Sequence, residues 1–142
     1  MEVRRVVVKR LLCPDRVRRI EGSFGWVDHR FITGGFLREL TPIEILLYFF
    51  LAVVGDRDGL SFYQDDRIVS LLKIDLLSLG KARHGLIKRS LIAYESPLYQ
   101  VLSLPPEPLI LPSEEERERK EQEIAHYYLK KIREIIQRKE EL

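Results

Sequence analysis

Residues 65–102 read DDRIVSLLKIDLLSLGKARHGLIKRSLIAYESPLYQVL, and this stretch decides the fold. Either Asp65 or Asp66 can cap a two-turn helix over 67–72, because a carboxylate accepts hydrogen bonds from the free N–H groups of a first helical turn. After a short break, Asp75 offers the same cap to a second, longer helix. Two helices this close in the chain predict a helix-turn-helix.

The second helix, expected over 76–90, combines a buried stripe with a basic face. Leu79, Ala82 and Leu86 recur at i, i+3 and i+7, which indicates a side that packs on a core. Gly80 and Gly85 lie inside the same helix, where each costs about 1 kcal/mol relative to Ala. Close approach of another helix, or of DNA, would explain them.

A hairpin follows this helix. The runs 91–94 and 98–102 have the composition of strands, and Glu95-Ser96-Pro97 connects them. Upstream, Thr41-Pro42-Ile43-Glu44 is typical of a helix start, and we expect a helix over 42–54. Residues 60–63 then form a short strand.

The resulting order is helix, strand, helix, helix, hairpin, which is the order of a winged helix-turn-helix. We therefore predict an α+β fold that is mainly α with a small β-hairpin, extended by a long C-terminal helix. The chain divides into a basic, aromatic and irregular segment (1–40), the winged-helix domain (41–104), a proline-rich linker (105–112) and a charged helix (113–142). Within the first segment, Val3 to Leu12 is either a strand or a flexible basic arm.

The positive charge is concentrated at the N-terminal end. Residues 1–40 carry nine basic and five acidic residues, residues 41–104 seven of each, and residues 105–142 eight basic and ten acidic. A polyanionic partner is compatible with this distribution. Cys13 is alone, the apolar run Ile43 to Val54 is too short to cross a bilayer, and no signal peptide is evident, so we expect a cytoplasmic protein that contacts no membrane.

Ile74 through Leu102, with Leu86-x-x-x-Ser90-Leu91-Ile92 leading into Tyr99-Gln100-Val101, resembles the end of winged-helix domains of bacterial transcription regulators and plasmid replication initiators. In that family the position of Ser90 is usually glycine. The block from Phe24 to Phe31, followed by this module, also looks like small helix-turn-helix proteins encoded near bacterial mobile elements. The resemblance implies sequence-specific binding of double-stranded DNA through Lys81, His84 and their neighbours. We therefore expect a non-enzymatic regulator of transcription, replication or transposition.

Helix 76–90 is the one expected to enter the major groove, with Lys81 and His84 facing base edges. The hairpin turn carries no basic residue, so an N-terminal arm would supply further phosphate contacts. The predicted DNA-binding residues are Ser78, Lys81, Arg83, His84, Lys88 and Arg89 on the helix, and Arg4, Arg5, Lys9 and Arg10 in the arm.

The C-terminal helix has one apolar stripe, which predicts either a homodimeric coiled coil or a helix that folds back onto residues 42–54. We favour dimerisation, although a stripe of two to three heptads is short. A protein partner at this helix is also possible. The residues expected to dimerise are Ile124, Tyr128, Ile132, Ile135 and Ile136.

A second interpretation is a winged-helix module that does not bind DNA and assembles with proteins through helix 42–54 and the C-terminal helix. The balanced charge of residues 41–104 favours it. An enzyme is the least favoured class: Asp28 and His29 are adjacent, but no nucleophile accompanies them and neighbours on a strand point in opposite directions. The sequence predicts no catalytic residue, cofactor or metal site.

Overall fold

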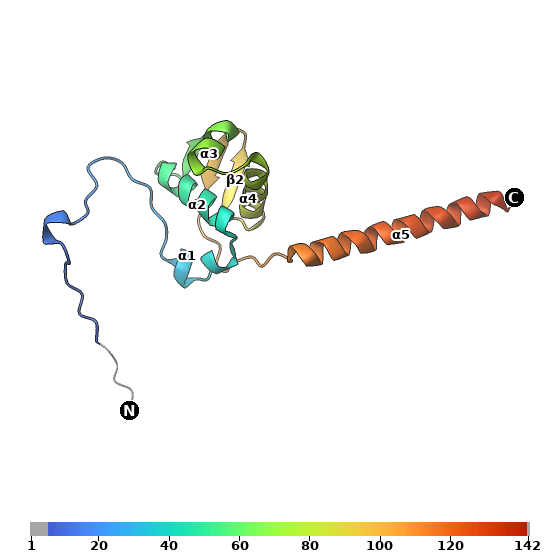
Figure 1. Cartoon of the computed structure of the whole chain (residues 1–142), viewed down its shortest axis with the longest axis horizontal. Coiled ribbons are helices and arrows are strands. Elements are labelled where there is room, and N and C mark those ends of the chain that lie inside the picture. The colour runs from blue at the N-terminus through green and yellow to red at the C-terminus, as the bar shows by residue number, and fades with distance from the viewer. Residues whose placement is uncertain (1–5, 142) are drawn as a thin grey trace, which may run out of the picture.

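The structure is a computed structural model that describes residues 6–141. A folded body carries two appendages that project away from it (Figure 1). One is the N-terminal stretch, with a single 3-10 turn, η1 (Pro14–Arg16). The other is the long helix α5 (Glu114–Glu140). The body combines helices with a small antiparallel sheet, which confirms the predicted α+β class.

The elements of the body follow the predicted order of helix, strand, helix, helix and hairpin. They are α2 (Pro42–Val54), β1 (Leu60–Phe62), α3 (Asp65–Leu72), α4 (Leu76–Lys88), β2 (Ile92–Glu95) and β3 (Leu98–Val101).

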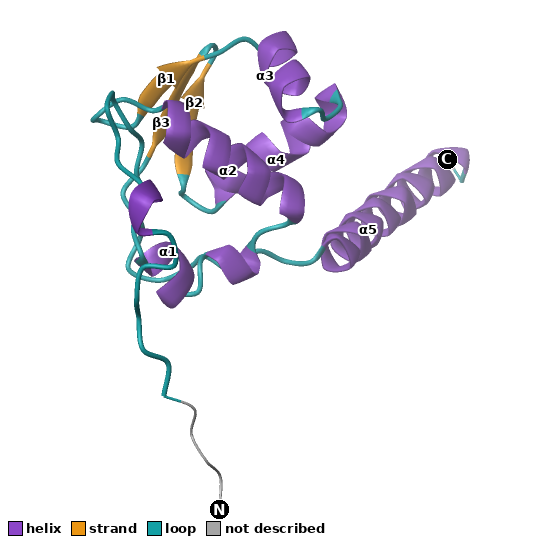
Figure 2. Ribbon diagram, turned by 60° about the vertical axis from the view of Figure 1, so that its left-hand side comes forward, coloured by secondary structure: helices purple, strands orange, loops and turns teal. Residues whose placement is uncertain are grey.

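The three strands form one sheet in the order β1-β3-β2, and both pairs are antiparallel. Leu60 pairs with Gln100 across the first pair, and Tyr94 pairs with Tyr99 across the hairpin. The helices cover one side of this sheet (Figure 2). The first strand of the chain is thus tied to the last, which closes the body.

Two of the predicted helix caps are confirmed. Thr41 accepts a hydrogen bond from the Glu44 amide at 3.2 Å, and the Thr41 amide donates to the Glu44 carboxylate at 2.9 Å, which completes a capping box. Asp75 caps α4. The prediction for α3 is wrong, because the helix begins at Asp65 and its N-cap is Gln64, which makes no side-chain cap.

The core lies between the helices and the sheet. The predicted stripe of Leu79, Ala82 and Leu86 is confirmed as buried. It joins Leu47 and Leu51 of α2, Ile68 of α3 and Tyr99 of β3, all of them fully buried. Burial of each large apolar side chain stabilises the fold by about 1.5–3 kcal/mol.

The segment before α2 is more ordered than the sequence predicts. It contains α1 (Arg30–Thr33) and the 3-10 turn η2 (Leu37–Glu39). Phe31 stacks on Tyr48 with ring centroids 4.4 Å apart, and Phe36 is also buried, so this segment packs with the body. Phe24 and Trp26 of the same segment, by contrast, are largely exposed.

For each appendage, one of the two predicted alternatives does not occur among the described residues. No strand forms between Val6 and Leu12, the described part of the predicted N-terminal strand. At the other end, α5 buries none of its described residues and points away from the body, so it does not fold back onto α2 (Figure 1). Within residues 6–141 no helix combines the length and the apolar character needed to span a bilayer.

Candidate nucleic-acid interface

The turn between α3 and α4 sets the direction of α4. Lys73 ends α3 in the left-handed conformation, with φ of 56°. Asp75 then accepts hydrogen bonds from the Ser78 amide at 2.7 Å and from the Ser78 hydroxyl at 2.9 Å. These bonds, the one from the amide foremost, hold the pKa of Asp75 below its usual value. The Ser78 hydroxyl, predicted to contact DNA, therefore already donates within the protein.

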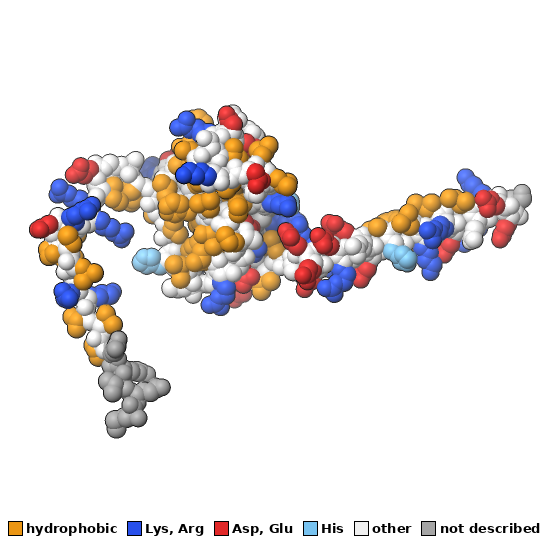
Figure 3. Space-filling model, viewed as in Figure 1, with side chains coloured by type: hydrophobic (Ala, Val, Ile, Leu, Met, Phe, Trp, Pro, Cys, Tyr) orange, Lys and Arg blue, Asp and Glu red, His pale blue; other side chains and the backbone are white. Residues whose placement is uncertain are grey.

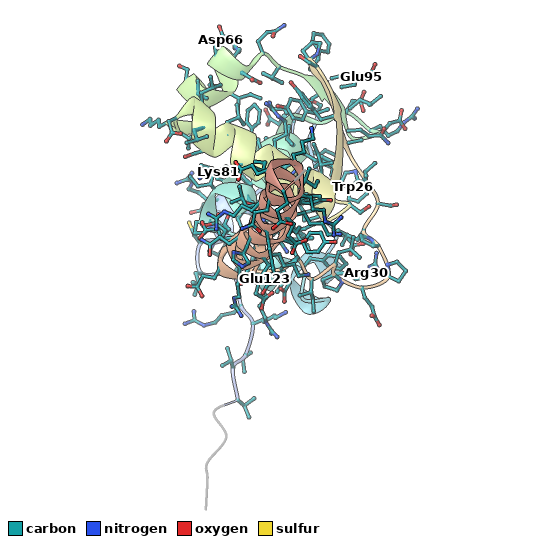
Figure 4. The ribbon with its side chains drawn as sticks, turned by 90° about the vertical axis from the view of Figure 1, so that its right-hand side faces the viewer. Trp26, Arg30, Asp66, Lys81, Glu95 and Glu123 are labelled. Carbon is teal, nitrogen blue, oxygen red and sulfur yellow. The ribbon has the colours of Figure 1, made fainter. Side chains whose placement is uncertain are left out.

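Opposite its buried stripe, α4 presents an exposed ridge. Because a helix turns about 100° per residue, Leu77, Lys81, His84 and Lys88 share the side that faces away from Leu79, Ala82 and Leu86. All four ridge residues are exposed. Lys81 lies on the side of the body from which α5 projects, as the view along α5 shows (Figure 4).

The ridge is not uniformly polar. Leu76 and Leu77 at the start of α4 have 61% and 69% of their surface exposed. Two adjacent exposed leucines at a helix start are unusual when no partner covers them. The ridge thus offers apolar contact at one end and positive charge further along.

The two glycines of α4 lie in different environments. A Cβ at position 85 would come within 2.9 Å of Glu44 Cδ, so Gly85 allows α2 to approach α4 closely. A Cβ at position 80 would meet no atom within 4 Å. Close helix packing explains Gly85 and does not explain Gly80, which borders the exposed ridge.

Arg83, one of the predicted DNA-binding residues, is engaged in contacts within the protein. Its guanidinium donates to Asp65 at 2.8 Å and to the Tyr99 hydroxyl at 2.9 Å, and it lies 4.3 Å from the centroid of the Tyr94 ring. Burial alone would lower the pKa of Arg83, but these hydrogen bonds outweigh burial and raise its pKa. Arg83 therefore connects α4 to α3 and to both strands of the hairpin.

Arg89 is likewise directed inward. Its Nε lies 3.4 Å from a carboxylate oxygen of Glu44, and both side chains are largely buried. The same carboxylate caps α2 through Thr41. Of the six predicted residues on this helix, the structure leaves Lys81, His84 and Lys88 together on the surface, and it engages Ser78, Arg83 and Arg89 in internal contacts.

A groove of about 490 Å³ runs along one flank of the ridge. Ser78, Lys81 and His84 line it from α4, while Thr41 and Glu44 line it from α2. The third wall consists of Leu111, Pro112 and Ser113 before α5, and of Glu114 and Arg117 in its first turn. The C-terminal helix therefore leaves the body directly beside the ridge.

The hairpin and the N-terminal stretch contribute unequally. Only Ser96 and Pro97 separate β2 from β3, and the charged residue beside them is Glu95, so this tip carries no cation. Lys9 and Arg10 are exposed on the N-terminal stretch. Arg4 and Arg5 lie outside the described residues.

Sequence reasoning missed one candidate. Lys73 is exposed in the turn that precedes α4, next to the end of the helix that would face DNA. A lysine between the two helices of a helix-turn-helix was a readable signal, because that turn lies near the recognition helix.

Asp28 contacts Arg30, and no hydrogen bond within residues 6–141 joins Asp28 to the His29 side chain. Asp28 accepts a hydrogen bond from the Arg30 amide at 2.8 Å, which lowers its pKa, and it lies 3.4 Å from Arg30 Nε. It therefore stabilises the start of α1. In the described part of the chain, no group of three or more His, Cys, Asp or Glu side chains is placed to hold a metal ion.

Comparison with known proteins finds no family model that matches the chain, and neither a curated protein nor a solved structure that is significantly similar to it.

Proposed function

We propose that the protein is a non-enzymatic, double-stranded DNA-binding protein with a winged-helix body, and that it regulates transcription, replication or transposition. The observation that carries the proposal is the exposed ridge of α4, where Lys81, His84 and Lys88 follow one another at helical spacing. The order of the elements and the strand order β1-β3-β2 support the winged-helix assignment. In such folds the second helix of the pair lies in the major groove.

The internal contacts of Arg83 and Arg89 support this role indirectly. Arg83 joins α4 to Asp65 and Tyr99, and Arg89 joins the end of α4 to α2. These contacts hold α4 at its middle and at its end. A helix that is held rigidly in this way loses less conformational entropy when it binds DNA, so its affinity is higher. These arginines would position the ridge without touching DNA.

Gly80 adds a second, independent argument. Packing within the body does not require a glycine at position 80, because the space beside it is open. A glycine beside the ridge lets a bulky surface approach the helix backbone closely. The wall of a DNA groove is such a surface.

The phosphate contacts in this proposal are few. Lys73 precedes the ridge and Lys88 lies at its C-terminal end. Lys9 and Arg10 belong to the N-terminal stretch, and the hairpin tip offers no cation. Two phosphate contacts from the body predict that log K falls with log salt concentration with a slope of about −2. Binding to random DNA would then be weak, and specificity would depend on the ridge.

The test is fluorescence-anisotropy binding to duplex DNA over a salt series. The variant with both Lys81→Ala and His84→Ala should bind at least about tenfold more weakly, since each base contact contributes about 1–3 kcal/mol. Arg57→Ala is the matched control, because this exposed arginine lies in the turn between α2 and β1. Absence of binding at low salt, or equal loss in the control, would overturn the proposal.

A second function is favoured by the apolar surface. Leu76 and Leu77 are exposed on α4, and Phe49 and Val53 are more than half exposed on α2. A winged-helix module that binds a protein partner would use these side chains instead of the lysines. Its binding would respond little to salt, and Leu77→Ser would weaken it while Lys81→Ala would not.

A further inference from the structure

We propose that α5 pairs with α5 of a second copy in antiparallel orientation, so that the two bodies lie at opposite ends of a helical rod. The pairing itself does not depend on DNA binding. Only its consequence for DNA rests on the function proposed above.

The C-terminal half of α5 carries an exposed apolar stripe. At about 100° per residue, its apolar side chains from Ile124 to Ile136 fall within an arc of about 140°, with Tyr127 outside it. Figure 3 shows apolar side chains gathered along one side of the outer half of this helix. Every large member of the stripe is at least half exposed: Ile124, Tyr128, Leu129, Ile132, Ile135 and Ile136 have between 51% and 61% of their surface exposed.

The stripe lies on the part of α5 that is distant from the body. It begins ten residues after Glu114, where α5 leaves the body, and the helix points outward (Figure 1). The protein's own body therefore does not cover it. An apolar face of this width on an otherwise charged helix is the pattern of a helix that pairs with another helix.

The core positions of α5 continue beyond the stripe at both of its ends, and we call this row of positions the core line. Ala125, Tyr128, Ile132 and Ile135 occupy the two core positions of a heptad repeat. Extending the same two positions toward the N-terminus gives Glu121, Glu118 and Glu114. Extending them toward the C-terminus gives Lys139. The core line is thus acidic before the stripe and basic after it.

A parallel pair would place like charges opposite each other along this line. Glu121 would face the partner's Glu121, Glu118 the partner's Glu118, and Lys139 the partner's Lys139. Like charges facing each other at core positions are destabilising. The parallel arrangement would thus weaken both ends of a short apolar seam.

An antiparallel pair removes this conflict. Core layers in which Ile132 faces the partner's Tyr128 also bring Ala125 opposite the partner's Ile135. The same alignment brings Glu121 opposite the partner's Lys139, at both ends of the seam. The apolar residues then face apolar residues throughout, and each end is closed by a pair of opposite charges.

The charge of the whole helix agrees with this orientation. Residues 114–123 contain six acidic and three basic residues, whereas residues 124–140 contain five basic and two acidic residues. In the alignment above, residues 118–123 of one helix lie alongside residues 137–142 of the other, and residues 114–117 extend past the partner helix. The charge complementarity therefore depends mainly on the Glu121–Lys139 pairs at the two ends of the seam. This complementarity identifies a second copy of the same helix as the occupant of the stripe.

The orientation determines the distance between the bodies. With residue 130 at the twofold axis, the two α5 helices begin about 48 Å apart at 1.5 Å per residue. Two adjacent DNA half-sites are separated by one helical turn, about 34 Å. The dimer would therefore hold its two ridges farther apart than one turn of DNA.

The test reverses charges at the ends of the seam and measures the dimer dissociation constant by sedimentation equilibrium. Glu121→Lys and Lys139→Glu should each weaken the dimer by about tenfold, and the double variant should restore it. Glu123→Lys is the matched control, because it makes the same charge change on the side opposite the stripe (Glu123 is labelled in Figure 4). A double variant that is no tighter than the singles would overturn the antiparallel pairing.

A distance measurement decides the orientation directly. In a Cys13→Ser background, spin labels at Glu115→Cys should lie about 45 Å apart in the antiparallel dimer and below about 25 Å in a parallel one. A short distance between the labels would overturn the proposal. A protein that stays monomeric at about 100 μM would also overturn it, because even a weak, short coiled coil should dimerise at that concentration. Packing of the α5 stripe on α2 of the second copy, instead of on its α5, would overturn the proposal as well. None of these results involves DNA, so each leaves the function proposed above untouched.

Discussion

The carboxylate of Glu44 lies against the backbone of Gly85, where α2 packs on α4. The carboxylate also caps α2 through Thr41 and pairs with Arg89. One buried acidic group therefore fixes the start of one helix and the end of another. Its position depends on the absence of a side chain at residue 85.

Gly85→Ala should lower the free energy of unfolding by about 2 kcal/mol. The new methyl group would displace the Glu44 carboxylate, and the capping box and the ion pair with Arg89 would be lost together. Urea unfolding followed by circular dichroism measures the change. A variant as stable as the wild type would show that Glu44 can move at no cost.

Gly80→Ala is the matched substitution on the same helix, and it should raise the free energy of unfolding by about 1 kcal/mol. The reason is that its Cβ enters open space and alanine favours the helix. If the ridge binds DNA closely, the same variant should bind DNA more weakly despite its greater stability. Unchanged DNA affinity would remove Gly80 from the argument for an interface.

Arg83→Met should lower the free energy of unfolding by about 3 kcal/mol. The side chain of Arg83 has only 17% of its surface exposed, and its loss leaves Asp65 and Tyr99 without their shared donor. Lys81→Met, two residues earlier on the exposed ridge, should change stability by no more than about 0.5 kcal/mol. Thermal unfolding of the two variants side by side separates the structural arginine from the surface lysine.

Ser90→Gly should raise the free energy of unfolding by about 0.5–1 kcal/mol. Ser90 has a φ of 60°, a left-handed conformation that costs an L-residue about 1–2 kcal/mol and costs glycine little. The greater freedom of glycine in the unfolded chain offsets part of the gain. Ser90→Val should have the opposite effect, and a stabilising valine would contradict this account.

The stability contributed by the Asp75 cap should depend on pH. The folded-state pKa of Asp75 is held below the usual value of 3.8, so the contribution is present at neutral pH and is lost as pH falls through the lower, folded-state pKa. Wild type should therefore exceed Asp75→Asn in unfolding free energy at pH 7, and the difference should shrink below about pH 4. Asp58→Asn, in the turn between α2 and β1, is the control for charge alone, and it should show no comparable trend.

Local signals in the sequence predicted most of the body. Thr41-Pro42 and Asp75 are caps that act within one helical turn, and the spacing of Leu79, Ala82 and Leu86 reports a buried face directly. These features depend on neighbours in the chain. They are therefore readable without knowing the fold.

The inward direction of two arginines was not readable in this way. Arg83 meets Asp65 and Tyr99, which are 18 and 16 residues away, and Arg89 meets Glu44, which is 45 residues away. A basic residue at the border of a buried stripe looks the same in sequence whether it faces water or a distant carboxylate. The short helices α1 and η2 were not predicted for another reason. Three or four residues are too few to show a helical period in the sequence.

The contact between Arg30 and Leu104 has a mechanical consequence. The guanidinium of Arg30 donates to the Leu104 carbonyl at 3.3 Å, so the chain enters and leaves the body at neighbouring points. A tension applied through the two appendages would reach this contact before it reached the buried core. A unit whose ends meet in this way can also be spliced into a surface loop of another protein without opening its own fold.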